Sequence, residues 1–149
     1  MKQVGQGQVA VPKNWEMRVQ LTYIEPADTL KVPLALQTTQ AKPRANIVVS
    51  RVPATNPSPE SAMNEFYQQT AQAVPGLKRM NQENFKFVDG GEGIALTVSF
   101  HATPQVRLVQ KHVFRIDDEV LTQLVATVDE PRISELDSTL GDIMKSFKP

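Results

Sequence analysis

Residues 94–128 read IALTVSFHATPQVRLVQKHVFRIDDEVLTQLVATV, and this stretch decides the fold. Apolar and polar side chains alternate along much of it with a period of two, which is typical of β-strands. Two turn signals, Thr103-Pro104 and Asp117-Asp118, interrupt the alternation. The stretch therefore predicts three consecutive antiparallel strands.

The first of these strands has two faces of different chemistry. One face carries ordinary core residues, namely Ile94, Leu96, Val98 and Phe100. The other carries small or polar ones, namely Ala95, Thr97, Ser99 and His101. A face that is neither plainly polar nor plainly apolar contacts a helix of its own chain or a partner, unless it is simply the solvent face of the sheet.

Counting inward from the two turns predicts which side chains meet. The first turn pairs residue 97 with residue 110 and residue 95 with residue 112. The second places residue 123 beside residue 112 and residue 125 beside residue 110. Since paired residues share a face, we predict a partner-binding patch made of Thr97, Ser99, Leu108, Gln110, His112, Gln123 and Val125. A one-residue slip at either turn would move a strand's residues to the opposite face.

The chemistry of this patch suits an apolar helix. An unsatisfied buried polar group costs about 1–3 kcal/mol, so the amides, hydroxyl and imidazole need water or a ligand to supply hydrogen bonds. A helix that carries a few small polar residues would meet both the aliphatic and the polar side chains. The alternative remains a solvated sheet face.

The rest of the chain supplies further strands and two helices. We expect strands around residues 9–11, 17–23, 34–36, 47–49 and 85–88. Ser58 and Pro59 are typical of a helix start, and Pro75-Gly76 ends that helix. A second helix is expected from Pro131 to the end, with one apolar stripe made of Ile133, Leu136, Leu140, Ile143 and Phe147.

This order of elements predicts an α+β fold, in which an antiparallel twisted sheet of about six to seven strands packs against two main helices. The 149 residues are expected to form a single domain, residues 1–149. Gly141 should weaken the second helix by about 1 kcal/mol relative to alanine.

Composition excludes several classes of function. Sixteen basic and sixteen acidic side chains balance, so the chain has no electrostatic signature of a nucleic-acid-binding protein. It has no cysteine, and no segment approaches the roughly 20 apolar residues of a membrane span. We expect a cytoplasmic protein without stable membrane insertion, or a periplasmic one if an export signal has been removed.

No motif in the sequence predicts catalysis. His101 and His112 are the only histidines, and the register above gives neither an acidic neighbour on its own face. Neither a metal-ligand spacing nor the glycine-flanked serine of a nucleophile elbow is present. Gly90 and Gly91 lie between two strands and are expected to form a hairpin turn. We therefore expect a non-enzymatic protein without a metal or another cofactor.

Several segments resemble the DcrB-like bacterial family of the PsbP/Mog superfamily. Residues 8–15 read QVAVPKNW and are similar to the family's opening strand followed by Leu-Pro-x-Gly-Trp, with Asn14 in place of the glycine. ANIVVSR at residues 45–51, VPG at residues 74–76, the three-strand meander and IMKSFK at residues 143–148 follow in the family's order. The resemblance covers nearly the whole chain and implies a PsbP/Mog-like fold.

Members of this family that have no signal peptide resemble chaperones encoded beside type VI secretion effectors. Those chaperones are dimers whose concave sheets shield the transmembrane helices of the effector before export. The resemblance therefore implies a homodimer with an effector's apolar helix as its partner, although His112 stands where a glutamine is expected and Gln110 lies nearby. The alternative is a periplasmic or envelope-associated DcrB-like binding protein with an unknown ligand.

Overall fold

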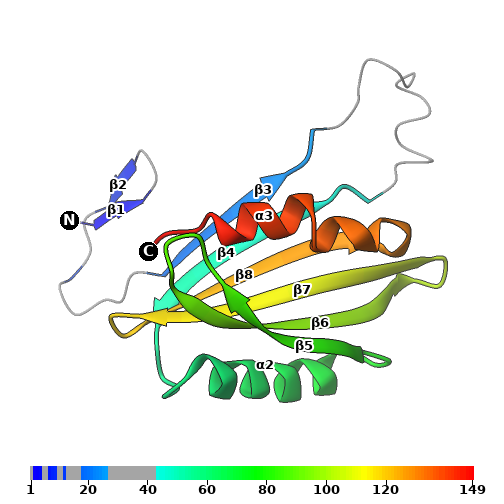
Figure 1. Cartoon of the computed structure of the whole chain (residues 1–149), viewed down its shortest axis with the longest axis horizontal. Coiled ribbons are helices and arrows are strands. Elements are labelled where there is room, and N and C mark those ends of the chain that lie inside the picture. Colours follow the sequence, from blue (N-terminus) through cyan, green and yellow to red (C-terminus); the bar gives the residue numbers. More distant parts are fainter. Residues whose placement is uncertain (1, 5–6, 10–11, 13–17, 27–42) are drawn as a thin grey trace.

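A computed structural model describes residues 2–4, 7–9, 12, 18–26 and 43–149 of the chain. Its main feature is a six-stranded antiparallel sheet in the order β3-β4-β8-β7-β6-β5, and β1 and β2 form a separate two-stranded sheet (Figure 1). The strands are β1 Lys2–Val4, β2 Gly7–Val9, β3 Val19–Ile24, β4 Asn46–Pro53, β5 Lys78–Lys86, β6 Glu92–Thr103, β7 Val106–Asp117 and β8 Val120–Asp129. The helices are α2 Pro59–Ala73, the 3-10 helix η1 Glu130–Leu136 and α3 Thr139–Lys145.

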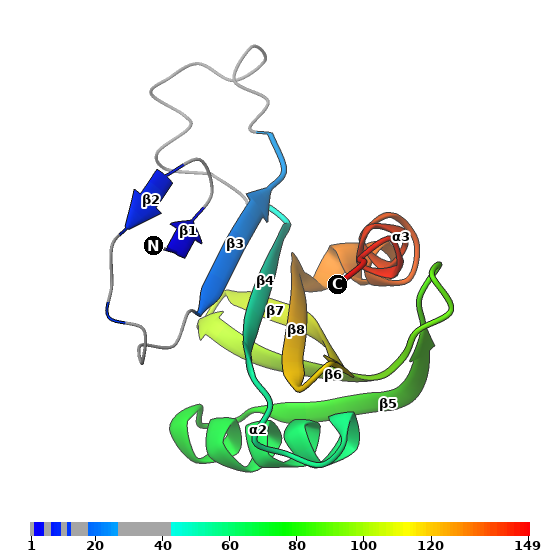
Figure 2. The same ribbon diagram turned by 90° about the vertical axis from the view of Figure 1, so that its left-hand side faces the viewer.

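The predicted α+β fold is confirmed. Helix α2 and helix α3 lie on opposite faces of the sheet, and the end of the sheet formed by β5 and β6 curls up beside α3 (Figure 2). Each face has its own buried cluster: Met63, Leu96 and Phe114 belong to the α2 side, while Phe85 and Val113 belong to the α3 side. The sheet is therefore a layer with a core on each side.

The expected start of α2 is confirmed. Ser58 has extended backbone angles, and its Oγ accepts a hydrogen bond from the Ser61 amide at 3.1 Å. Pro59 occupies the first turn, where its missing N–H leaves no bond unmade. Ala62 and Met63 are buried, and Phe66 and Tyr67 pack beside them. The buried side of α2 thus faces β6 and β7.

Two strand predictions agree with the structure only in part. The strand around residues 47–49 is β4, but the strand expected at residues 85–88 begins earlier, because β5 starts at Lys78. Strand β5 is an edge strand whose residues are exposed except for Phe85, so its polar sequence lacks the alternation that predicts a strand. Parts of the strands expected at residues 9–11 and 17–23, and all of the one at 34–36, lie outside the described residues.

The single C-terminal helix expected from the sequence is wrong. The segment breaks into η1 and α3, and Arg132 inside η1 has non-helical backbone angles. The Arg132 guanidinium donates hydrogen bonds to Glu25 at the end of β3 and to Glu135. Ile133 and Ile143 are 39% and 50% exposed, whereas Leu136, Leu140 and Met144 are buried. Tertiary contacts therefore override the continuous helical spacing.

The same break changes the role of Gly141, because a Cβ at this position would lie 2.7 Å from the Leu136 carbonyl oxygen. Gly141→Ala is expected to destabilise the protein by about 1–3 kcal/mol, since this backbone contact outweighs the gain in helix propensity. Urea unfolding followed by circular dichroism measures the change. The control is Thr139→Ala at an exposed position of the same helix, and a Gly141→Ala protein as stable as this control would contradict the prediction.

The predicted register of the first hairpin is wrong by one residue. Thr97 pairs with Lys111 and Ser99 with Val109, because an irregularity between His101 and Thr103 absorbs one extra residue near the turn. Such a bulge changes the register by one, and a one-residue change reverses the face on which every side chain of the strand lies.

The second hairpin closes one residue later than predicted, with Asp117 paired to Val120. Its turn residues, Asp118 and Glu119, have φ angles of 46° and 63°, which fits the left-handed backbone of a tight hairpin turn. Moving a turn by one residue changes each pairing by two residues and so preserves the faces. Gln123 therefore still shares a face with His112, although its direct partner is Phe114.

Candidate functional site

The structure divides the predicted patch between the two faces of the sheet. The β7 and β8 residues stay together on the face that carries α2, and these are Leu108, Gln110, His112, Gln123 and Val125. Thr97 and Ser99 lie on the opposite face, so their assignment to the same patch is wrong. Ser99 is 1% exposed, and its Oγ accepts a hydrogen bond from Arg107 Nη2 at 2.8 Å.

Four side chains of the α2-side face form a continuous hydrogen-bonded row. Gln123 Nε2 donates to His112 Nδ1 at 3.1 Å, His112 Nε2 lies 3.0 Å from Gln110 Oε1, and Gln110 Nε2 donates to Thr127 Oγ1 at 3.1 Å. These directions place the imidazole proton on Nε2. These polar groups therefore satisfy one another's hydrogen bonds. The sequence had suggested only water or a ligand as their partners.

His112 anchors this row beneath α2. The Phe66 ring of α2 lies 4.4 Å from the imidazole between centroids, and His112 is 4% exposed. Burial lowers the pKa of His112 to about 4, because the charged imidazolium would lose its hydration. The imidazole is therefore neutral near pH 7, and it positions Gln110 and Gln123 while α2 covers it.

Strand β4 extends the face beyond the residues predicted from sequence. Val48 pairs with Val125 and Ser50 pairs with Gln123, and all four are half-buried. We call the surface formed by Leu108, Gln110, Gln123, Val125, Val48 and Ser50, with His112 and Thr127 beneath it, the mixed face. Counting through hairpins could not reach β4, because about 70 residues separate β4 from β8 in the chain. The run Ile47-Val48-Val49 predicts a strand, but it has no alternation that would assign its residues to a face.

The mixed face combines hydrogen-bonding groups with aliphatic ones. Amide and hydroxyl groups offer hydrogen bonds, and the valines and Leu108 offer aliphatic contact. His101 is on the opposite face from His112, so the two histidines do not form one site. Within the described residues, no group of three or more His, Cys, Asp or Glu side chains has the arrangement of a metal site. Among the described helices, none has the length and apolar character needed to cross a bilayer.

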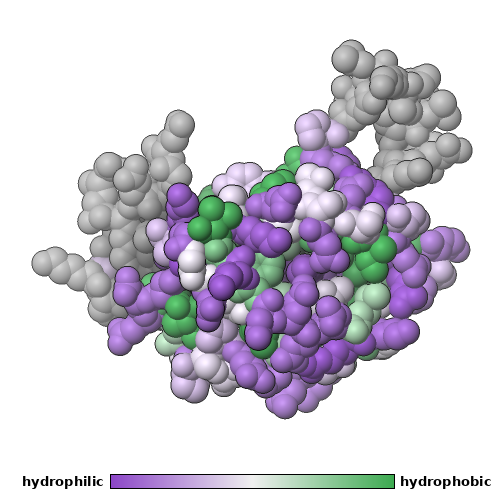
Figure 3. Space-filling model, in the orientation of Figure 1, coloured by the Kyte–Doolittle hydropathy of each residue, from purple (hydrophilic) through white to green (hydrophobic). Residues whose placement is uncertain are grey.

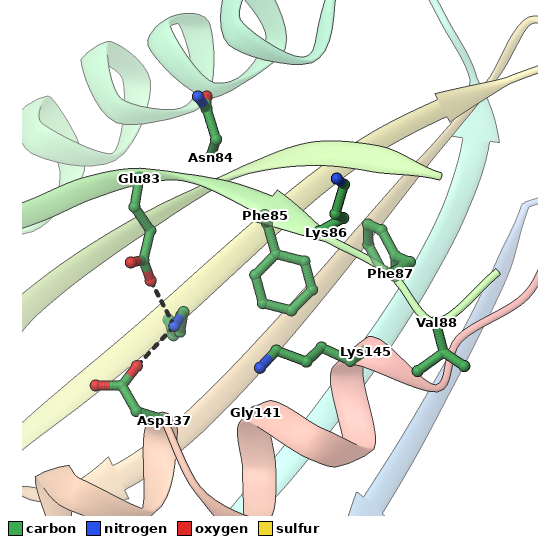
Figure 4. Close-up of a pocket in the computed structure, with 10 residues that line it drawn as sticks. Glu83, Asn84, Phe85, Lys86, Phe87, Val88, Asp137, Gly141 and Lys145 are labelled. Atoms are coloured by element: carbon green, nitrogen blue, oxygen red, sulfur yellow. Dashed lines mark hydrogen bonds and ion pairs between the residues drawn. The ribbon is translucent and has the colours of Figure 1, made fainter. Parts of the chain in front are cut away.

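The other side of the molecule has a different surface. Figure 3 shows that the surface on this side is mostly hydrophilic and that its hydrophobic patches are small and separate from one another. An open pocket lies there between β5 and α3 (Figure 4), and Lys111 is one of the residues that line it. The Lys111 ammonium lies 2.7 Å from Glu83 Oε1 and 2.8 Å from Asp137 Oδ1. The mixed face and this pocket are therefore separate features on opposite sides of the sheet.

Solved structures show likeness at the level of the fold. The crystal structure of PA94 from Pseudomonas aeruginosa, described as a protein of unknown function and a candidate regulator, matches with a TM-score of 0.69 and 14% identity, covering 99% of this chain and 94% of that chain. LpqN of Mycobacterium tuberculosis, described as involved in cell envelope biogenesis, matches with a TM-score of 0.46 and 12% identity, covering 85% and 81%. The first match shows a shared fold, and the second carries no argument.

No protein-family model matches the chain. No curated protein sequence matches it either.

Proposed function

We propose that this protein is a non-enzymatic chaperone or adaptor that binds an apolar, transmembrane-type helix on the mixed face, beside α2. The observation that carries the proposal is the hydrogen-bonded row from Gln123 to Thr127 within an aliphatic, half-exposed part of the sheet. A row that is already held by internal bonds loses little side-chain entropy when a partner covers it. The face is thus preorganised for a guest that is mainly apolar.

The hydrogen-bonding capacity that remains specifies the guest more closely. Gln123 keeps its carbonyl oxygen and its second N–H, and Gln110 keeps its second N–H, after their bonds within the row are counted. A helix with small residues such as serine, threonine or glycine on one side could approach closely and use these groups. Val48, Val125 and Leu108 would contact its aliphatic residues.

The sequence resemblance to DcrB-like proteins supports the biological form of this proposal. In it, the guest is the apolar helix of a type VI secretion effector, and the protein holds that helix in the cytoplasm before export. The protein acts as a homodimer, so that two mixed faces are present for one effector. The proposed role involves no cofactor.

The test is binding to an effector segment encoded beside this protein. We expect Val125→Glu to weaken binding of the segment's N-terminal apolar helix by about tenfold or more, because the complex would bury a carboxylate without a partner. Co-expression followed by affinity purification measures recovery, and titration of the purified components gives the Kd. Thermal unfolding of each variant shows whether the fold is intact.

The matched control is Thr97→Glu, which makes the same kind of change at a half-buried residue on the other face. It should bind like the original protein. Equal binding by the Val125 and Thr97 variants would place the site elsewhere. A gene neighbourhood without any secretion or effector gene would contradict the secretion role.

A further inference from the structure

The pocket on the α3 side of the sheet has the size and composition of a small-molecule site. Its volume is about 490 Å³ (Figure 4). Its lining comes from β5 and the two residues after it, from β7, from Asp137 just after η1, and from α3. Pockets for small ligands range over about 300–1,000 Å³ and combine an apolar body with a few polar groups. The residues that matter here are Glu83, Phe85, Phe87, Lys111, Asp137 and Lys145.

Aromatic rings form the apolar part of this pocket. Phe85 and Phe87 are 5% and 3% exposed, and their rings meet edge to face with centroids 4.9 Å apart. The Lys111 ammonium lies 5.6 Å from the centre of the Phe85 ring, within the range of a cation–π contact. The rings form the apolar wall of the pocket, and an apolar side chain would contact the part of them that remains exposed.

The pocket contains charges of both signs, and two carboxylates share one buried ammonium. Lys111 is 4% exposed and binds two carboxylates, Glu83 and Asp137. Burial opposes its charge, but the hydrogen bonds to Asp137 and Glu83 outweigh that effect and raise the pKa of Lys111. One ammonium therefore faces two carboxylates, which leaves an excess of one negative charge. Each carboxylate can still accept further hydrogen bonds.

A second cation lies at the other side of the pocket. Lys145 is half-buried at the end of α3, and Figure 4 shows its ammonium directed toward the space between Phe85 and Asp137. No acidic group of the described residues forms an ion pair with it. Lys86 also lines the pocket, but Figure 4 shows its side chain directed away from the space that Lys145 enters. The pocket thus offers one unpaired ammonium and one excess carboxylate above a pair of aromatic rings.

We propose that this pocket binds a small zwitterion with an apolar side chain, of the class of a free apolar amino acid. The ligand carboxylate pairs with Lys145, its ammonium is accepted by Asp137 and Glu83, and its side chain packs on Phe85 and Phe87. This assignment matches each charge in the pocket with the opposite one and uses the rings for the apolar part. It is independent of the mixed face, which lies across the sheet.

The test uses L-phenylalanine as the probe, with two analogues that each lack one charge. Titration of the 15N-labelled protein up to about 10 mM ligand is expected to show saturable shifts at Phe85, Gly141 and Lys145. Phenylpropionate, which has no ammonium, and phenethylamine, which has no carboxylate, should each bind at least about tenfold more weakly.

Two variants test the positive and the negative charge of the pocket separately, and a third variant serves as the control. Lys145→Gln should weaken L-phenylalanine about tenfold and leave phenethylamine unchanged, while Asp137→Asn should weaken L-phenylalanine and leave phenylpropionate unchanged. Asp137 is largely exposed, and Lys111 keeps Glu83 as its ion-pair partner after the replacement. Lys86→Gln should behave like the original protein. Absence of saturable shifts, equal binding of all three compounds, or an ineffective Lys145→Gln change would each overturn the proposal.

Discussion

Replacement of Arg115 with methionine is expected to lower the free energy of unfolding by about 3 kcal/mol. Arg115 is 3% exposed on the α3 side of β7. Its guanidinium binds both oxygens of Asp89, at 2.9 and 2.7 Å, and both oxygens of Asp117, at 2.7 and 3.1 Å. It also lies 4.6 Å from the centre of the Phe87 ring. One side chain therefore ties the β5–β6 turn to the end of β7.

The size of this effect follows from the exposure of the partners. Hydrogen bonds to charged groups contribute about 1.5–3 kcal/mol each, so four of them could suggest a larger loss. The side chains of Asp89 and Asp117 are 22% and 26% exposed, and water can replace part of what the arginine supplied. Methionine fills the space over Phe87 but supplies none of the bonds. A side chain at Gly91 would overlap the guanidinium, which shows how closely the turn packs on it.

Urea unfolding measures this loss, and Arg107→Met is the matched control. Arg107 is on the same strand and face, but it is 30% exposed. It forms one ion pair, with Glu130, which is 54% exposed, and one further hydrogen bond, to the Ser99 hydroxyl. An exposed ion pair contributes about 1 kcal/mol or less. Similar losses of unfolding free energy in the two variants would contradict the prediction, because the buried position of Arg115 would then add nothing to stability.

The second large effect is a loss of stability in mild acid that depends on His112. The pKa of His112 is lowered by burial to about 4, whereas an unfolded histidine has a pKa near 6.5. The unfolded chain therefore binds more protons between these values, so stability falls as the pH decreases from about 6.5 to 4. The difference of about 2.5 between these two pKa values corresponds to about 3 kcal/mol of stability, most of which is lost by pH 4.

The measurement is the free energy of unfolding at pH 7 and pH 4 for the original protein and for His112→Gln. The variant should lose about 3 kcal/mol less over this range, because glutamine has no charge to acquire. His101→Gln, at the exposed histidine, should retain the full loss. A direct NMR titration of the His112 ring gives an independent result, and a midpoint near 6.5 would contradict the argument.

The elements that could be predicted from sequence are those that local chemistry determines. The cap at Ser58 and the alternation in β6, β7 and β8 each act within a few residues, and the structure agrees with the helix start and the three strands that they predict. The β5 strand and the broken C-terminal helix differ because an exposed edge has no alternation and because Arg132 binds Glu25, more than 100 residues away. A local sequence pattern predicts neither the position of a strand at an exposed edge nor a contact between residues so far apart in the chain.

The candidate site divides in the same way. The sequence by itself determined that Gln110, His112, Gln123 and Val125 share a face. The second turn lies one residue later than predicted, but this moves each pairing by two residues and leaves every side chain on its predicted face. Only the tertiary structure decided that Thr97 and Ser99 lie on the other side, since a bulge beside Thr103 changes the register by one. It also decided that β4 completes the face and that Phe66 covers His112. Alternation is a local property with a period of two, whereas the choice of face depends on a single extra residue and on contacts between distant segments.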